Sequence, residues 1–280
     1  MLITLFYISV FGIGLAFGSF LNVLVYRLRK NQSILGRSHC PKCGAQIAWY
    51  DNIPLFSFII LGGRCRHCGK KISWEYFFVE LITALLFVFV VFQIAGDYKV
   101  ISHVYPLPDL FDYIGFIFHV LSGWITIFLG LFIFIYDFKY QEIKDRVLIP
   151  GIFLIFFFNL FLPTLGVKPG RGLVFNRFVS ILIASALPIL FFLAQYFFTK
   201  RKGIGLGDLR IGAFIGVALV QFKLVVLALF LAYIIGSLTC LILLAIKKKK
   251  LKSHIALGPF LVIGLFIALF WGEKIINWCF

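Results

Sequence analysis

Charged residues are scarce in this sequence, and acidic residues are the rarest of them. Of the 280 residues 14% are charged, with 11 acidic side chains against 27 of Lys and Arg. Soluble globular domains are nearer one quarter charged. In addition, 62% of the residues are hydrophobic and the mean hydropathy is +1.03. The shortage of charge therefore excludes an ordinary soluble domain and indicates a membrane protein.

The apolar runs also lack the regular alternation that marks the strands of a membrane β-barrel. Several of them approach or exceed the roughly 20 residues that a helix needs to cross a bilayer. Backbone amides in hydrocarbon must be bonded within their own segment, which such runs achieve as helices. We therefore predict an all-α, polytopic membrane protein with about eight transmembrane helices. The expected spans are approximately 2–25, 76–93, 113–136, 147–162, 178–198, 209–220, 224–246 and 255–271.

The formal net charge of +16 could suggest a nucleic-acid partner, but the placement of the cations argues against one. Four alternate loops hold 21 of the 27 Lys and Arg residues, namely 27–71, 138–146, 200–210 and 247–252. Basic loops between apolar spans normally lie on the cytoplasmic side and contact anionic lipid head groups. We expect an inner-membrane protein whose partners include membrane lipids and no nucleic acid. The first run is too long for a signal peptide and has no basic start, so we expect an uncleaved helix.

Four of the six cysteines form two C-x-x-C pairs in the first basic loop. Cys40 and Cys43 are followed by Cys65 and Cys68. Two such pairs, about twenty residues apart, can place four thiolates tetrahedrally around one Zn²⁺. Two disulfides or a redox pair are the alternative, which a reducing cytoplasmic loop disfavours. A closed shell of four sulfur atoms leaves no open position, so we expect the zinc to be structural.

Two aspartates stand at the ends of apolar runs. Asp137 follows the third expected span, and Asp208 directly precedes the sixth, after Gly203, Gly205 and Gly207. A carboxylate at membrane depth is costly and points to function, although ordinary interfacial charge is the alternative. Alternating glycines disfavour a regular helix and suit a close approach of backbone, such as a substrate strand beside the carboxylate. Phosphate binding by this G-x-G pattern is a weaker interpretation, because no β-strand precedes it.

Two carboxylates that meet in a site of low dielectric constant cannot both ionise easily, so the pair shares one proton. The ionised member can then activate water as a general base, while the protonated member polarises a scissile carbonyl group. This chemistry needs no serine or cysteine nucleophile. Such a dyad titrates as a unit, so the proton belongs to the pair.

The segments around the two aspartates resemble those of a known family. The segment ending at Asp208 resembles the GxGD signature of the type IV prepilin peptidases, and Asp137 with the two residues after it resembles the segment around that family's first catalytic aspartate. Further likeness to the bifunctional bacterial branch lies in 18–23, 26–28, 52–54, 79–81 and the paired cysteines. The family often has proline at the position of Lys144 and lysine at that of Arg210. Neither departure removes a proposed catalytic group.

The resemblance implies an intramembrane aspartic endopeptidase that removes the short basic leader of type IV prepilins or pseudopilins at the cytoplasmic membrane face. Asp137 and Asp208 would carry that step. It also implies N-methylation of the new N-terminus with S-adenosylmethionine. The expected parts are a first transmembrane helix (1–26), a cytoplasmic four-cysteine zinc-binding domain (27–75) and a transmembrane aspartic peptidase domain (76–280). No glycine-rich Rossmann turn marks a binding site for S-adenosylmethionine.

Three other functions fit part of the pattern. One is a peptidase without methyltransferase activity. Another is an ion-coupled transporter that uses its intramembrane aspartates, which would favour ionisable groups near the midplane and repeated halves. The sequence has neither feature. The third is a zinc-stabilised membrane scaffold, which leaves the stretch 203–208 without a role. Nothing in the sequence indicates an oligomeric state.

Overall fold

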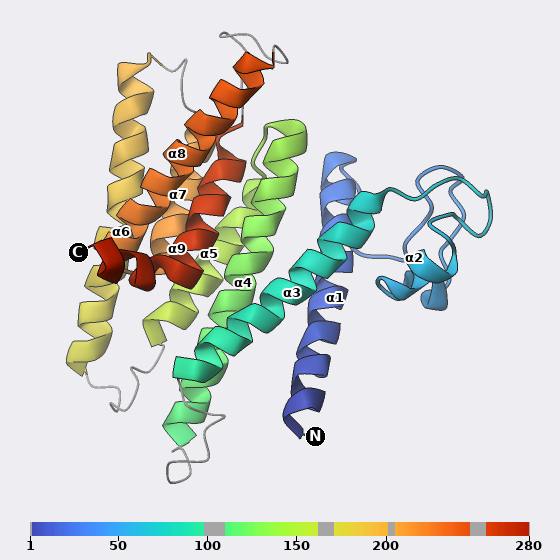
Figure 1. Ribbon diagram of the computed structural model, residues 1–280, viewed down its shortest axis with the longest axis horizontal. Helices are drawn as coiled ribbons and strands as arrows, with labels where there is room; N and C mark the ends of the chain where they lie inside the picture. The colour runs from blue at the N-terminus through green and yellow to red at the C-terminus, as the bar shows by residue number, and fades with distance from the viewer. Residues whose placement is uncertain (1, 98–109, 162–170, 201–204, 247–255, 280) are drawn as a thin grey trace. The chain divides into compact units, whose positions relative to one another are not determined.

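The computed structural model describes residues 2–97, 110–161, 171–200, 205–246 and 256–279. Within these ranges every regular element is a helix, and the only β-type pairings are two isolated bridges (Figure 1). The predicted all-α class is therefore confirmed. The elements are α1 (Leu2–Arg29), η1 (Trp49–Asn52), α2 (Phe56–Ile60), α3 (Trp74–Asp97), α4 (Leu110–Tyr140), α5 (Asp145–Phe161), α6 (Arg171–Phe198), α7 (Leu206–Leu219), α8 (Phe222–Ala245) and α9 (Gly258–Cys279).

Among the described residues, six helices are long and apolar enough to cross a membrane, where about eight spans were expected. By length and composition, α1, α3, α4, α6, α8 and α9 could each cross a membrane. The fourth and sixth expected spans are α5 and α7, which have 17 and 14 residues. At about 1.5 Å per residue they reach roughly 25 and 21 Å, less than the hydrocarbon core of about 30 Å. Both helices lie where the sequence predicts them, and they begin two and three residues earlier than expected, at Asp145 and Leu206.

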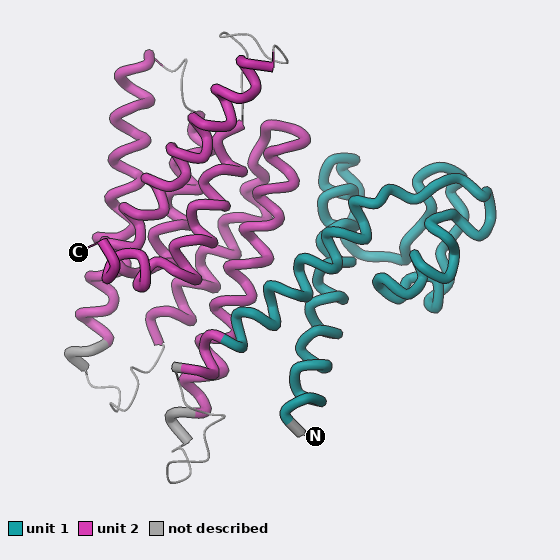
Figure 2. Tube along the Cα trace, viewed as in Figure 1, with its two compact units in different colours: residues 1–92 teal, residues 93–280 magenta. Residues whose placement is uncertain are grey.

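The chain forms two compact units, Met1–Phe92 and Gln93–Phe280 (Figure 2). In the first unit, α1 packs closely against α3 through glycine. A Cβ added at Gly14 would lie 2.6 Å from Cα of Ala84, and one added at Gly18 would lie 2.7 Å from Cα of Glu80. Small residues at such a crossing let two apolar helices approach and gain packing energy within a membrane.

The cysteine-rich loop is tied to these helices by two buried charged side chains. The Arg27 guanidinium donates hydrogen bonds to four loop carbonyl groups between Ser33 and Arg37, at 2.6–3.3 Å. A carboxylate oxygen of Glu80 accepts the backbone N–H of Leu55 at 2.9 Å. These bonds satisfy charges that would be costly to bury alone, and they fix where the loop leaves and rejoins the helices.

The second unit is a bundle of α4 to α9 in which the short helix α7 contacts α5, α6, α8 and α9. Its side chains Ile211, Phe214 and Ile215 are fully buried. A buried polar bridge joins α4, α5 and α7, because Asn159 accepts from the Ser122 hydroxyl and donates to the Val217 carbonyl, both at 2.8 Å. The burial of α7 holds its first turn in a defined position.

Candidate active site and metal centre

Asp137 lies in the last turn of α4 and is almost fully buried, with 7% of its surface exposed. Its Oδ2 atom accepts the backbone N–H of Gly258, the first residue of α9, at 3.0 Å. The positive end of a helix dipole favours a carboxylate at this place. A Cβ at Gly258 would collide with that same oxygen atom. Glycine is therefore needed where α9 meets the carboxylate.

Asp208 lies in the first turn of α7. Its Oδ2 atom accepts the backbone N–H of Gly205, the N-cap residue, at 3.0 Å, so the carboxylate caps its own helix. Gly205 is extended, as expected for a residue outside a helix. Gly207 lies within α7, so the expectation that the alternating glycines disfavour a helix does not hold at this position. Gly203 lies outside the described residues.

The role of Gly207 is close packing. A Cβ there would lie 2.6 Å from Cδ1 of Ile143, a residue of the turn that follows α4. The start of α7 is also joined to the start of α5 by an ion pair, in which Arg210 contacts Asp145 at 2.6 Å. Because the turn after α4 carries the chain on from Asp137, the close packing of Gly207 on Ile143 draws the two aspartate-bearing segments together.

Asp137 and Asp208 lie in the same part of the second unit, close enough for their charges to interact. Ile211, one turn after Asp208 on α7, would be 3.1 Å from a Cβ at Gly258, the residue that binds Asp137. The two acids thus approach from the end of α4 and the beginning of α7, with the beginning of α9 beside them.

A hydrogen-bonded pair of polar side chains, one of which interacts with Asp208, could not be predicted from the sequence. The hydroxyl group of Tyr233, on α8, donates to Oε1 of Gln195, on α6, at 2.8 Å. The charge on Asp208 also acts on Tyr233. Both residues stand inside long apolar runs, where a single tyrosine or glutamine is an ordinary finding, so no local signal distinguished them.

The four cysteines of the loop form one cluster. The Sγ atoms of Cys40, Cys43, Cys65 and Cys68 all lie within 4.8 Å of one another, and none of them is in a disulfide. Tetrahedral Zn²⁺ with Zn–S bonds of about 2.3 Å would place its sulfur ligands roughly 3.8 Å apart, so the cluster fits this metal. It does not support the alternative of two disulfides.

Each pair of cysteines belongs to a tight turn that ends at glycine. The N–H groups of Gly44 and Gly69 donate to the carbonyl groups of Cys40 and Cys65, both at 2.9 Å. Both glycines have positive φ, at +74° and +65°, which a side chain would disfavour. Burial opposes ionisation of the Cys40 thiol, but hydrogen bonds from nearby backbone N–H groups lower its pKa to about 7. The turn thus favours the thiolate form of Cys40, the form that a metal requires. At Cys43 a backbone hydrogen bond from Ala45 lowers the pKa, but burial and the neighbouring thiols raise it to about 11.

A pocket of about 500 Å³ adjoins the cysteine turns, and it does not suit S-adenosylmethionine. The residues that line it include two cations, Arg64 and Lys71, and no acid. S-adenosylmethionine carries two positive centres, a sulfonium and an ammonium group, beside a single carboxylate. Like charges would oppose its binding here, and we assign no described residue to this cofactor.

Two known protein families match the chain, one in its N-terminal part and one in its C-terminal part. Residues 13–94 match the bacterial peptidase A24 N-terminal domain, which includes the four cysteines. Residues 124–242 match the type IV leader peptidase family, which includes Asp137 and Asp208. No solved structure matches the chain.

Curated relatives match nearly the whole length. The prepilin leader peptidase/N-methyltransferase of Legionella pneumophila is 30% identical over 306 residues, which cover 97% of this chain and 93% of that protein. The protein of the same name from Vibrio cholerae is 29% identical, with coverages of 94% and 96%. The one from Myxococcus xanthus is 54% identical over 84 residues, 30% of this chain and 25% of that protein. The chain therefore belongs to the type IV leader peptidase family.

Proposed function

We propose that this protein is a multi-pass inner-membrane enzyme that cleaves the leader from type IV prepilins or pseudopilins and methylates the new N-terminus. The observation that best supports the peptidase activity is that the buried Asp137 and Asp208 lie close enough for their charges to interact. The name of the full-length relatives supports both activities. The N-terminal match, which includes the cysteine loop, supports membership of the bifunctional bacterial branch.

The proposed peptidase step is general acid–base catalysis by the two aspartates. The ionised carboxylate takes a proton from water, whose oxygen attacks the scissile carbonyl carbon, while the protonated carboxyl group gives its proton to the carbonyl oxygen. The tetrahedral intermediate then collapses and the C–N bond breaks. The carboxyl group that took the proton from water gives it to the leaving amine, and the other carboxylate takes a proton back from a hydroxyl group of the intermediate, which becomes the new C-terminal acid. Because the dyad lies in a largely apolar bundle, its hydrogen bonds to the reacting atoms are stronger than in water.

Backbone hydrogen bonds are proposed to orient both acids. Each aspartate uses Oδ2 to accept a backbone N–H, from Gly258 for Asp137 and from Gly205 for Asp208. We expect the Oδ1 atoms to face the water and the substrate. With one oxygen of each acid held by the protein backbone, little reorganisation is needed when the substrate binds, which is the condition for efficient electrostatic catalysis.

The cysteine cluster is proposed to hold one structural Zn²⁺ through Cys40, Cys43, Cys65 and Cys68. Four thiolates fill a tetrahedral shell, so the metal would fold the loop and take no part in peptide hydrolysis. We retain the division into a first helix (1–26), a zinc-binding domain (27–75) and a peptidase domain (76–280). S-adenosylmethionine is proposed as the methyl donor, and it would supply a methyl group to the newly exposed amine.

The proposed orientation places the zinc loop and both aspartates on the cytoplasmic side. Three of the four basic loops support this orientation, because basic loops favour the cytoplasmic side. The loop 27–71 contains the cysteine cluster, 138–146 directly follows Asp137, and 200–210 contains Asp208. A prepilin leader synthesised in the cytoplasm would then meet both activities at one face of the membrane.

The test is co-expression of the full chain with a candidate prepilin in a host that lacks its own leader peptidase, followed by mass spectrometry of the pilin N-terminus. We expect loss of the leader together with the added mass of one methyl group. A processed but unmethylated pilin would support the peptidase alone. An intact prepilin, with every candidate substrate tried, would contradict the proposal.

A further inference from the structure

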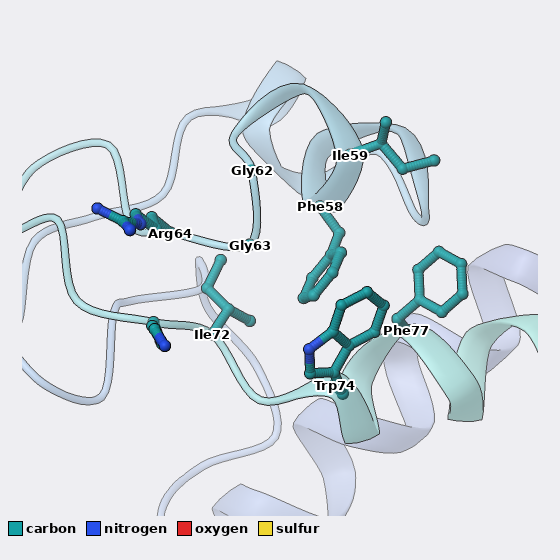
Figure 3. Close-up of a pocket in the computed structure, with 9 residues that line it drawn as sticks. Phe58, Ile59, Gly62, Gly63, Arg64, Ile72, Trp74 and Phe77 are labelled. Atoms are coloured by element: carbon teal, nitrogen blue, oxygen red, sulfur yellow. The ribbon is translucent and has the colours of Figure 1, made fainter.

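The pocket beside the cysteine turns is apolar at one end. The rings of Phe58, Trp74 and Phe77 gather there, with Phe58 4.9 Å from Trp74 and 5.5 Å from Phe77 between ring centroids (Figure 3). Trp74 and Phe77 belong to the first turn of α3, and Phe58 belongs to α2. The aromatic end of the pocket therefore lies where a membrane-length helix begins.

The other end of the pocket is basic. Arg64 and Lys71 oppose each other in an antiparallel bridge, and residues directly opposite in such a pair have side chains on the same face. Figure 3 shows the Arg64 side chain extending away from the three rings. No acidic residue is among those that line the pocket. One cavity thus offers apolar rings at one end and two positive charges at the other.

The surface around the pocket is apolar where a soluble loop would be polar. Ile60 on α2 is 77% exposed and Trp74 is 62% exposed, and Phe56, Ile59 and Phe78 are exposed as well. Contiguous apolar surface of this kind marks contact with a protein or a membrane. The helix α3 is long and apolar enough to span a bilayer from Trp74 onward, so these exposed apolar side chains lie beside the end of a membrane-length helix. Tryptophan is itself enriched at the membrane–water interface.

We propose that the pocket binds an anionic phospholipid and that α2 lies in the membrane interface. The phosphate group would contact Arg64 and Lys71, and the upper part of an acyl chain would lie against Phe58, Trp74 and Phe77. Charge complementarity selects this ligand over S-adenosylmethionine, and continuity with α3 selects a lipid over a soluble anion. The proposal does not depend on the aspartic site.

The experiment uses the purified full chain with either phosphatidylglycerol or phosphatidylcholine, and native mass spectrometry counts the lipids that remain bound. We compare the wild type with Arg64→Gln/Lys71→Gln. The matched control is Lys30→Gln/Lys70→Gln, which removes the same charge from the same unit at residues that do not line the pocket. We expect preference for phosphatidylglycerol to fall about tenfold in the pocket variant and by less than twofold in the control.

A second measurement keeps the proposal testable if the pocket variant folds poorly. Zinc content reports whether the neighbouring cysteine loop is intact. A phosphatidylglycerol analogue with a photoreactive group near the head of an acyl chain should label residues 56–78 of the wild-type protein. Equal loss of lipid in both variants, or labelling outside this segment, would overturn the proposal. Competition of S-adenosylmethionine with the lipid would also overturn it, in favour of a cofactor site.

Discussion

The carboxylate of Asp137 and the backbone N–H of Gly258 are joined by a hydrogen bond of 3.0 Å, although 121 residues separate them. This bond fixes one oxygen atom of the acid at the N-terminus of α9. It also leaves no room for a side chain at Gly258, because a Cβ there would overlap Oδ2 of Asp137. Gly258 is therefore proposed as a positioning residue of the aspartic site.

Replacement of this glycine tests the relationship. In Gly258→Ala the methyl group must displace either the Asp137 carboxylate or the start of α9. Misplacement of a reacting group by about 1 Å can cost roughly 100-fold in rate. We expect leader cleavage to fall by about that factor while the protein still accumulates in the membrane, as measured by the rate of prepilin processing in membrane extracts.

The control for this variant is Gly236→Ala in α8. A Cβ at Gly236 would be 3.4 Å from the Phe260 ring, an ordinary contact. We expect its cleavage rate to stay within about twofold of the wild type, since alanine is also the better helix former. Equal rates for the two alanine variants would show that Gly258 does not position Asp137.

Removal of either acid should abolish cleavage. Asp137→Asn and Asp208→Asn keep the size of the side chain and its ability to accept the backbone N–H, but they lose the proton-transfer group. General acid–base catalysis contributes about 10²–10⁴-fold, so we expect at least a hundredfold loss of processing in each variant. The measurement is the ratio of processed to unprocessed prepilin on a gel, with membrane levels of each variant as the reference.

Asp145 provides the matched control for the two acids. It also lies at a helix end, and it pairs with Arg210 near the beginning of α7, but the ion pair is about two-fifths exposed. Exposed ion pairs contribute little to stability. We expect Asp145→Asn to retain cleavage within a few-fold. If Asp145→Asn were as inactive as Asp137→Asn, loss of a nearby negative charge would explain both, and the dyad would lose its support.

The sequence was sufficient to single out the two acids and the four cysteines as candidates because each stands out against its local background. Asp137 and Asp208 interrupt apolar runs, and the C-x-x-C pairs have a spacing that few structures other than a metal site require. Gly258 could not be found in this way, because it contributes a backbone N–H, which almost every residue has. Its role depends on where α9 begins relative to α4, which no local pattern records.

The starts of α5 and α7 lie two and three residues before the expected ones, for a related reason. Hydropathy reports how apolar a window is, while the end of a helix depends on caps and tertiary contacts. Arg27 illustrates the same limit. It counts as one more cation of a cytoplasmic loop by composition, yet it is buried and donates to four carbonyl groups of that loop. The local sequence identifies Arg27 as a cation, but the groups that it contacts in the folded protein determine its structural role.

Tyr233 should affect catalysis more weakly than the two acids. Its hydroxyl group donates to Gln195 and lies within electrostatic reach of Asp208, so Tyr233→Phe removes a dipole beside the dyad without changing the ring. We expect kcat for leader cleavage to fall about three- to tenfold, in line with one neutral hydrogen bond of about 1 kcal/mol, while KM changes little. A larger rise in KM than fall in kcat would assign Tyr233 to substrate binding.

Loss of two thiolates should empty the metal site. In Cys40→Ser/Cys43→Ser only Cys65 and Cys68 remain, and two ligands cannot hold structural Zn²⁺ at ordinary affinity. We expect about one zinc per chain in the wild type and nearly none in this variant, by elemental analysis of the purified protein. The loop should also become sensitive to protease between 33 and 74, because metal binding and folding of a small loop are coupled. Cys240→Ser, which changes a cysteine of α8 outside the cluster, should keep its zinc. Full zinc content in the double variant would reject the four-thiolate site.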